Sequence, residues 1–180
     1  MSTKTWRNKV TSQHWCILVV FLFLGLHLGY INTPFVNIEW VYRQGAQFFL
    51  TGDIIALEYY FNKQANPLTY SYLVSLLLSF TGIDQFAIYR LPALIGGTLL
   101  LLVLARYRNP WLVLLVALNP LIWIYSGRAY SELLAVGLML LAYEIQRHRA
   151  LGGFVGILSG AIKYHAFPIL LLNAGLNWLS

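Results

Sequence analysis

Long apolar blocks separated by short polar turns constrain the fold of this 180-residue chain more than any other feature. The first block covers residues 15–31, and the later ones cover residues 68–80, 91–105, 110–125, 133–143 and 151–179. Charged residues make up 10% of the chain and its mean hydropathy is +0.66, which is unusual for a water-soluble domain. Because lipid offers no water to backbone groups, such a chain must pair them internally, and helices do so. The sequence therefore predicts an all-α fold, a polytopic transmembrane helical bundle.

Basic residues are distributed unevenly between the predicted turns. If block 68–80 does not cross the membrane, the N-terminal tail and the turns at 106–109 and 144–149 lie on one side. That side carries seven basic residues and one acidic residue: Lys4, Arg7, Lys9, Arg106, Arg108, Arg147 and Arg149 against Glu144. The opposite side carries five of each: Arg43, Lys63, Arg90, Arg128 and Lys163 against Glu39, Asp53, Glu58, Asp84 and Glu132. Short cytoplasmic loops collect Lys and Arg, so we expect a multi-pass protein of the plasma (inner) membrane with a cytoplasmic N-terminus.

This arrangement predicts a single membrane domain over residues 1–180. It comprises a cytoplasmic tail at 1–14, a first span at 15–31, an outer loop at 32–89 that contains interfacial helices, and the remaining spans in 90–180. The first span is expected to be an uncleaved signal anchor, because it is long for a signal peptide and lacks a small-residue cleavage site. Asn119-Pro120 is expected to kink the span at 110–125, since proline removes a helical hydrogen bond.

Two segments of the outer loop have helical patterns. Between residues 39 and 50, the polar residues Glu39, Arg43 and Gln47 share one helical face, with apolar residues roughly opposite. We expect an amphipathic helix that rests on the membrane with this polar face toward whatever the outer side binds. Block 68–80 carries a serine at every fourth position from residue 71. That stripe suits a helix lying in the interface or against other protein.

Charged residues recur at the outer ends of the predicted spans, where Arg90, Arg128, Glu132 and Lys163 lie. Each alone has a simple structural interpretation, as a snorkelling side chain or a member of a surface helix pair. Their gathering on one side favours a functional site, because ionisable groups near the hydrocarbon are costly. Basic groups at the lipid boundary suit a lipid-linked phosphate. A nearby carboxylate can accept a proton from an attacking hydroxyl.

The outer loop and second span resemble a family of membrane enzymes through the run TGDIIALEYYFNKQANPLTYSYLVSLLLSFTGIDQFAIYRLPALIGGTLLLLVLARY. It is similar to the GT-C glycosyltransferases that use polyprenyl-phosphate sugars, in the branch of protein mannosyltransferases and lipid A aminoarabinose transferases. That branch carries an acidic motif, a Gly-Asp pair, a proline turn before an interfacial helix, and an Arg-x-Pro opening the next span. The counterparts here are Glu39, Gly52-Asp53, Asn66-Pro67-Leu68 and Arg90-Leu91-Pro92. The runs NPLIWIYSGRAYSELLAVGLMLLA and SGAIKYHAFPILLL resemble the later hairpin and the span that ends in a lysine.

The resemblance implies a transferase that moves a sugar from a polyprenyl-phosphate donor to an acceptor on the outer face, with inversion. It implies Glu39 as the catalytic base, with Asp53 as the alternative. We expect the substrate to contact charged residues of the outer side, namely Arg43, Asp53, Lys63, Arg90, Arg128, Glu132 and Lys163. The outer tyrosines either line a sugar groove or form an aromatic belt at the interface, and they are Tyr59, Tyr60, Tyr70 and Tyr72.

No cofactor is expected, and a divalent metal has no support because no His or Cys cluster has ligand spacing. The expected partners are the polyprenyl-phosphate sugar and the lipid bilayer, together with other membrane subunits if the chain is part of a complex. Nucleic acid is not expected, since membrane orientation accounts for the basic charge. GT-C enzymes usually continue through more spans, so the chain is expected to be incomplete relative to a full module. The alternative hypothesis is a non-catalytic membrane subunit or a truncated, inactive fragment of such an enzyme.

Overall fold

The computed structural model of the protein describes residues 3–36, 38–63 and 67–164, with side chains from residue 12 onward. Within these ranges the chain is all-helical, which confirms the predicted α class. The helices are α1 (Thr3–Tyr30), α2 (Glu39–Thr51), α3 (Ile54–Lys63), α4 (Thr69–Thr81), α5 (Phe86–Ala105), α6 (Pro110–Ala117), α7 (Pro120–Ser126), α8 (Ser131–Glu144) and α9 (Arg149–Ile162). Asn66 of the proline turn and the last apolar block beyond residue 164 lie outside the described residues.

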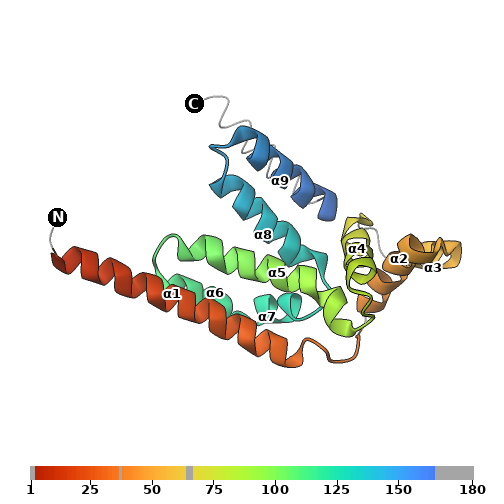
Figure 1. The fold of residues 1–180 in the computed structure, drawn as a ribbon, viewed down its shortest axis with the longest axis horizontal. Helices are drawn as coiled ribbons and strands as arrows, with labels where there is room; N and C mark the ends of the chain where they lie inside the picture. Colours follow the sequence, from red (N-terminus) through yellow and green to blue (C-terminus); the bar gives the residue numbers. More distant parts are fainter. Residues whose placement is uncertain (1–2, 37, 64–66, 165–180) are drawn as a thin grey trace.

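The helices form a bundle with a cap at one end (Figure 1). α1 and α5 pack together, α6 and α7 pack against them, α8 packs on α5, and α9 packs on α8. The cap consists of α2, α3 and α4, at the end where α1 finishes and α5 begins. The turns after α5 and α8 lie at the opposite end, where Arg106 pairs with Glu144 at 3.1 Å. The two basic turns thus lie together, as the predicted hairpins require.

Two of the described helices are long and apolar enough to cross a membrane. They are residues Ser12–Tyr30 of α1 and the whole of α5, Phe86–Ala105. Both correspond to predicted spans. α4 and α9 are apolar but shorter, and α8 has 14 residues, which is about 21 Å at 1.5 Å per residue. A hydrocarbon core is about 30 Å thick. Helix length therefore supports a membrane crossing by α1 and by α5, while the described helices at the other predicted spans are shorter than this thickness.

The predicted span at 110–125 is divided in two, not kinked. α6 ends at Ala117 and α7 begins at Pro120. Asn119 between them is extended, with ψ of 122°, because the ring of a following proline disfavours the helical conformation. Its side-chain oxygen accepts a hydrogen bond from the backbone N–H of Leu121 at 2.9 Å. The Asn-Pro pair therefore ends one helix and caps the next, which is a stronger effect than the expected kink.

Glycines set the close contact between α5 and α8. A Cβ atom on Gly96 would collide with backbone atoms of Leu133 and Leu134, and one on Gly137 would collide with the carbonyl oxygen of Gly96. The two backbones therefore touch without intervening side chains, as small residues permit in helix pairs. This contact fixes α8, and with it the turn before α8 that carries Arg128.

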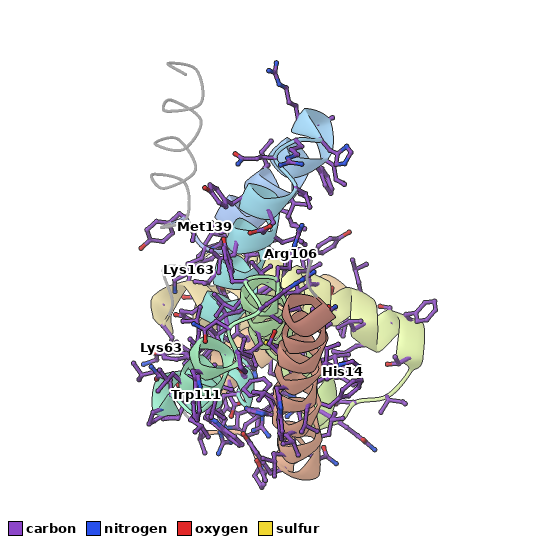
Figure 2. All side chains as sticks on the ribbon, turned by 90° about the vertical axis from the view of Figure 1, so that its left-hand side faces the viewer. His14, Lys63, Arg106, Trp111, Met139 and Lys163 are labelled. Atoms are coloured by element: carbon purple, nitrogen blue, oxygen red, sulfur yellow. The ribbon has the colours of Figure 1, made fainter. Side chains whose placement is uncertain are left out.

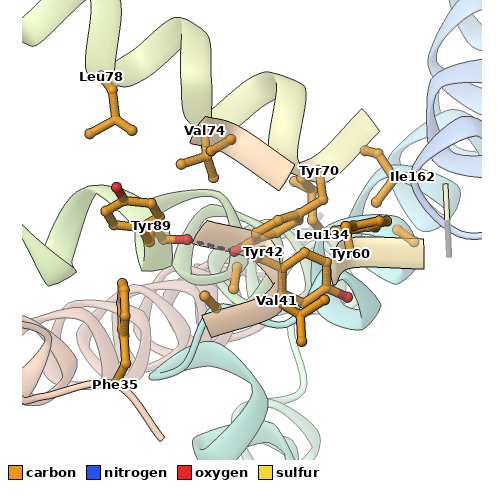
Figure 3. Packing of buried hydrophobic residues seen from close by; sticks show 14 residues of the cluster. Phe35, Val41, Tyr42, Tyr60, Tyr70, Val74, Leu78, Tyr89, Leu134 and Ile162 are labelled. Carbon is orange, nitrogen blue, oxygen red and sulfur yellow. Dashed lines mark hydrogen bonds between the residues drawn. The ribbon is translucent and has the colours of Figure 1, made fainter. Parts of the chain in front are cut away.

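An aromatic cluster fills the junction between the cap and the bundle (Figure 3). Tyr42, Tyr60 and Tyr70 are fully buried in it. The hydroxyl of Tyr70 donates a hydrogen bond to the backbone oxygen of Tyr89 at 2.8 Å, which is the dashed line in Figure 3. Tyr60 and Tyr70 are therefore core residues. For these two, both expected positions, in a sugar groove or in an interfacial belt, are wrong.

α2 forms over the predicted segment, and Arg43 and Gln47 of its predicted polar face are partly or fully exposed, but Glu39 of that face is buried. The buried residues of α2 are Glu39, Val41, Tyr42, Gly45 and Ala46. The expected outward-facing position of Glu39 is therefore wrong. A Cβ atom on Gly45 would collide with Ser71 of α4, whose hydroxyl donates to the backbone oxygen of Tyr42 at 3.1 Å. Small residues thus bring this face of α2 against α4. Ser71 and Ser75 of the serine stripe are buried against protein, one of its two expected settings, while Ser79 is exposed.

Apolar side chains cover much of the outside of the bundle (Figure 2). Phe21 of α1 is 68% exposed, Trp111 of α6 is 71% exposed, and Phe154 of α9 is 65% exposed. Other large exposed hydrophobic residues lie on α5, α7 and α8. Water-soluble monomers rarely expose contiguous apolar surface on this scale. The exterior of the bundle therefore favours an apolar environment.

Gly96→Ala should lower the free energy of unfolding by about 1–3 kcal/mol, because the added methyl group meets the backbone of α8. Gly25→Ala is the matched control, since nothing lies within 4 Å of its added Cβ. The control should keep or slightly raise stability, because alanine favours helices over glycine. Denaturant titration of the purified proteins measures both changes. Equal stability of the two variants would show that α5 and α8 do not make this close contact.

Candidate functional site

Glu39 and Arg90 form a buried ion pair where the cap meets the bundle. Glu39 is the first residue of α2, and Arg90 lies in the second turn of α5. Arg90 Nε lies 2.7 Å from Glu39 Oε1, and Arg90 Nη2 lies 2.9 Å from Glu39 Oε2. Neither side chain is exposed. Both carboxylate oxygens thus accept parallel hydrogen bonds from one planar guanidinium, a strong geometry for such a pair.

The Glu39 carboxylate accepts three further hydrogen bonds. Oε1 accepts from the backbone N–H of Ala129 at 2.8 Å. Oε2 accepts from the backbone N–H of Val36 at 2.9 Å and from Arg128 Nη1 at 3.3 Å. Burial alone would raise the pKa of Glu39, but the hydrogen bonds from Arg90, Val36 and Ala129 outweigh it and hold the pKa below its usual value. Glu39 is therefore an ionised and fully engaged carboxylate. Its role as catalytic base stays a prediction, and here neither oxygen is open to a substrate hydroxyl.

Arg90 also ties the linker between α1 and α2 to the start of α5. Its Nη1 donates to the backbone oxygen of Ile31 at 2.7 Å and to Thr33 Oγ1 at 2.9 Å. Its Nη2 donates to the backbone oxygen of Pro34 at 3.1 Å. A buried guanidinium needs such acceptors, because each unsatisfied N–H in an apolar setting is costly. The pair with Glu39 therefore organises the linker, α2 and α5 together.

Arg128 adds a second positive charge at the edge of the buried pair. It lies in the turn between α7 and α8, and 29% of its side chain is exposed. Its Nη1 lies 3.3 Å from Glu39 Oε2 and 3.2 Å from the backbone oxygen of Pro34, longer than the contacts that Arg90 makes with Glu39. Glu39, Arg90 and Arg128 are called the Glu39 cluster below. Arg128 is the cation of this cluster that an external anion can reach.

A second ion pair joins α8 to the residue that follows α9. Lys163 Nζ lies 2.8 Å from Glu132 Oε1, and the two side chains are 15% and 37% exposed. Glu132 Oε2 is buried and has no hydrogen-bond partner within the described part of the chain. Between this pair and the Glu39 cluster, the Tyr42 hydroxyl lies 2.9 Å from Ser131 Oγ. Residues 128–132 thus connect the two charged groups.

Arg43 pairs with a different acid. It lies one turn after Glu39 on α2, and its Nη2 is 3.3 Å from Asp84 Oδ2. The hydroxyl of Tyr89 donates to Asp84 Oδ1 at 2.9 Å. The Arg43 and Asp84 side chains are 34% and 62% exposed, so this contact is a surface pair. These three residues line an open cavity of about 350 Å³ beside α2 and α4.

Asp53 and Lys63 do not join these groups. Asp53 Oδ1 accepts hydrogen bonds from the backbone N–H groups of Ile55 at 2.9 Å and Ala56 at 3.3 Å. It therefore caps the start of α3, a common structural role of aspartate. Lys63 is exposed in the last turn of α3. Substrate contacts by these two residues stay a prediction for which the structure provides no shared site.

Two site contacts were not predicted from the sequence. Asp84 entered the charge balance of the outer side, but its partners Arg43 and Tyr89 lie at spacings that match no single helix face. The N–H of Ala129 carries no sequence signal at all, because any residue other than proline supplies one. The sequence offered one signal for Asp84, namely the position of an acidic residue just before the second predicted span. Backbone donors become visible only when the turn before α8 is placed beside Glu39.

The chemistry of the site is that of carboxylates, guanidinium groups and an ammonium group. Among the residues that the structure describes, no group of three or more His, Cys, Asp or Glu side chains is placed to hold a metal ion. The acids of the two main groups, Glu39 and Glu132, are each paired with a basic side chain. The arrangement can therefore bind an anion through its exposed cations and can accept a proton on a carboxylate oxygen.

Comparison with family models, with curated proteins and with solved structures finds no match for this chain. The likeness to GT-C enzymes therefore rests on the quoted motifs alone. The function of the chain has to be inferred from its own residues and contacts.

Glu39→Gln should lower the free energy of unfolding at pH 7 by about 3–5 kcal/mol, because Arg90 then stays buried without its counter-charge. The free energy of unfolding of the variant should also lose the pH dependence that titration of Glu39 gives the wild type. The pKa of Glu39 lies below its usual value of 4.5 in the folded protein. Its contribution to stability is therefore complete above pH 4.5 and is lost as the pH falls toward the folded pKa. Denaturant titrations at pH 7 and at steps below pH 4.5 measure this difference between wild type and variant.

Arg43→Gln is the control for that experiment, since it breaks an exposed pair and should change stability by less than about 1 kcal/mol. If wild type and Glu39→Gln lost stability in parallel as the pH falls, the depressed pKa of Glu39 would be refuted.

Proposed function

We propose that this chain is a membrane glycosyltransferase that moves a sugar from a polyprenyl-phosphate donor to an acceptor on the outer face of the membrane. The observation that carries the proposal is the convergence of two charged groups at the cap end of a bundle with an apolar exterior. In each group a carboxylate holds a basic side chain that keeps part of its surface exposed. These basic side chains are Arg128, at 29% exposure, and Lys163, at 15%.

The bundle lies in the plasma (inner) membrane with its N-terminus cytoplasmic and its cap outside. Two findings support this orientation. The exposed aromatic and aliphatic side chains of α1, α6 and α9 suit lipid. The basic turns at 106–109 and 144–149 lie together at the end opposite the cap, as expected for cytoplasmic turns. α1 and α5 cross the hydrocarbon by their own length, and the shorter helices complete a polytopic bundle beside them.

The donor phosphate binds to the two exposed cations. Guanidinium and ammonium groups pair well with phosphate oxygens, and a polyprenyl chain brings its phosphate to the lipid boundary where Arg128 and Lys163 lie. Arg90 is not exposed, so it positions Arg128 through Glu39 and does not contact the donor. As the bond between the anomeric carbon and the phosphate oxygen breaks, the two cations stabilise the negative charge that develops on the leaving phosphate.

Glu132 is the carboxylate better placed to accept a proton from the acceptor. Its Oε1 is held by Lys163, while its Oε2 has no hydrogen-bond partner in the described ranges. Oε2 is buried, so the Glu132 side chain, which is 37% exposed, must first turn toward the acceptor. The acceptor hydroxyl then gives its proton to this carboxylate as the hydroxyl oxygen attacks the anomeric carbon. The polyprenyl phosphate leaves with the bonding electrons, and the carbon is inverted. A base role for Glu39 requires Arg128 first to turn from Glu39 toward the donor phosphate.

The orientation can be tested by cysteine labelling in a Cys16→Ser background, since Cys16 is buried. A cysteine in place of Lys63, in the cap, should react with an impermeant maleimide added to intact spheroplasts. A cysteine in place of Arg147, in the turn after α8, should react only after the membrane is permeabilised. Both native side chains are exposed, so burial cannot explain a failure to react. Labelling of position 147 from outside would overturn the orientation.

The reaction can be tested with membranes that contain the chain and a polyprenyl phosphate carrying labelled mannose or aminoarabinose. Transfer of label to an acceptor should occur, and Glu132→Gln should slow it about 100-fold or more, because the proton acceptor is lost. Arg128→Gln should raise the KM for the donor. Glu58→Gln, which changes an exposed residue of α3, should leave the rate unchanged.

Each result of this assay selects between the hypotheses. A fully active Glu132→Gln variant together with a folded but inactive Glu39→Gln variant would assign the base to Glu39. If wild-type membranes transferred neither sugar, the chain would instead be a non-catalytic membrane subunit. That alternative is favoured by one observation, the complete engagement of both Glu39 oxygens in structural hydrogen bonds.

A further inference from the structure

The cavity beside Arg43 takes no part in the proposed reaction. It is an open space of about 350 Å³ lined by residues of α2, α4 and the start of α5, within the size range of small-molecule sites. A second open space of about 250 Å³ shares Arg43, Asp84 and Tyr89 with it. Because these residues line both spaces, the cavity and its neighbour adjoin each other around Asp84.

The groups in this cavity include both hydrogen-bond donors and acceptors. Asp84 has accepting oxygens, and 62% of its side chain is exposed. Arg43 keeps donors available, since its contact with Asp84 is a 3.3 Å surface pair at 34% exposure. The hydroxyl of Tyr89 holds Asp84 in place at 2.9 Å. Further amide and hydroxyl groups come from Gln47, Thr51 and Ser79.

The walls of the cavity are apolar and lie near exposed hydrophobic side chains. Leu50, Leu78 and Ile83 line it beside the polar groups. Phe80, next to the lining residue Ser79, is 93% exposed. A site with apolar walls and a few convergent polar groups is the usual form of a small-molecule pocket.

We propose that this cavity binds the ring of a hydroxyl-rich sugar, presented either as the headgroup of a glycolipid or as a free glycoside. A hydroxyl both donates and accepts hydrogen bonds, so sugar hydroxyls satisfy Asp84 and Arg43 at the same time. The charges of these two residues cancel. A phosphate headgroup would face the Asp84 carboxylate, and this like-charge contact disfavours it. The inference stands on the cavity itself and does not depend on the transferase reaction.

Saturation-transfer NMR on the full chain in phosphatidylcholine nanodiscs tests this site. Sugar-based detergents are avoided because they would compete for the pocket. The probes are methyl α-glucopyranoside, methyl α-mannopyranoside and methyl phosphate, each added separately, and each carries protons that do not exchange with water. At least one glycoside should receive saturation from the protein, and methyl phosphate should not receive it at this site. Nanodiscs that contain a glucosyl diacylglycerol should displace the free glycoside if the glycolipid is the natural source.

The variants Asp84→Asn and Ser79→Trp test whether binding occurs in this cavity. Asp84→Asn removes the charged acceptor and should weaken glycoside binding about tenfold or more. Ser79→Trp fills the cavity from the α4 side and should abolish binding. Glu58→Gln is the matched control, an exposed acid on α3 that does not line the cavity. All three variants should keep the wild-type unfolding midpoint, because each changes an exposed side chain.

Three results would each overturn the proposal. One is binding of methyl phosphate in the cavity with no binding of either glycoside. Another is no saturation transfer to any of the probes. The third is glycoside binding that Asp84→Asn and Ser79→Trp leave unchanged. Displacement by the glycolipid supports a headgroup ligand, and binding without displacement supports a free glycoside.

Discussion

The buried pair between Glu39 and Arg90 is the interaction on which the cap end of this structure depends. Moving two charges out of water is costly, and complete hydrogen bonding of both groups offsets that cost. The pair brings four segments to one point, namely the linker after α1, the start of α2, the start of α5 and the turn before α8. Because neither oxygen of Glu39 is free, the pair is a structural element, and the accessible charge at this end belongs to the groups around it.

The cations of the cap end differ in accessibility, and this difference separates their roles. Arg90 is fully buried, Lys163 and Arg128 are partly exposed, and Arg43 is the most open of the four. A buried arginine contributes position and fixes its neighbours, while a partly exposed one can exchange an internal contact for a ligand. The charged residues at the cap end therefore comprise one buried structural pair and, around it, basic side chains that solvent can reach.

The helical class and the grouping of charge at one end could be predicted from the sequence, because apolar runs and charge asymmetry are properties of neighbouring residues. The buried position of Glu39 on α2 could not. Spacing by four places Glu39 on a polar face with Arg43, yet a partner 51 residues away turns Glu39 inward. Packing of Gly45 against α4 has the same origin, since it depends on where another helix lies. The break at Asn119 was underestimated because a capping side chain adds to the effect of the following proline.

The distances along the chain between these partners have a consequence for biosynthesis. Glu39 emerges first, Arg90 follows 51 residues later, and the N–H of Ala129 follows 90 residues after Glu39. Contacts between residues so far apart in sequence form late, because the intervening loop must first be closed. Val36 and Arg90, which supply three of the five hydrogen bonds to Glu39, are synthesised before the turn that precedes α8, and that turn supplies the other two. The carboxylate at the start of α2 therefore obtains its full set of partners only after the turn before α8 has left the ribosome.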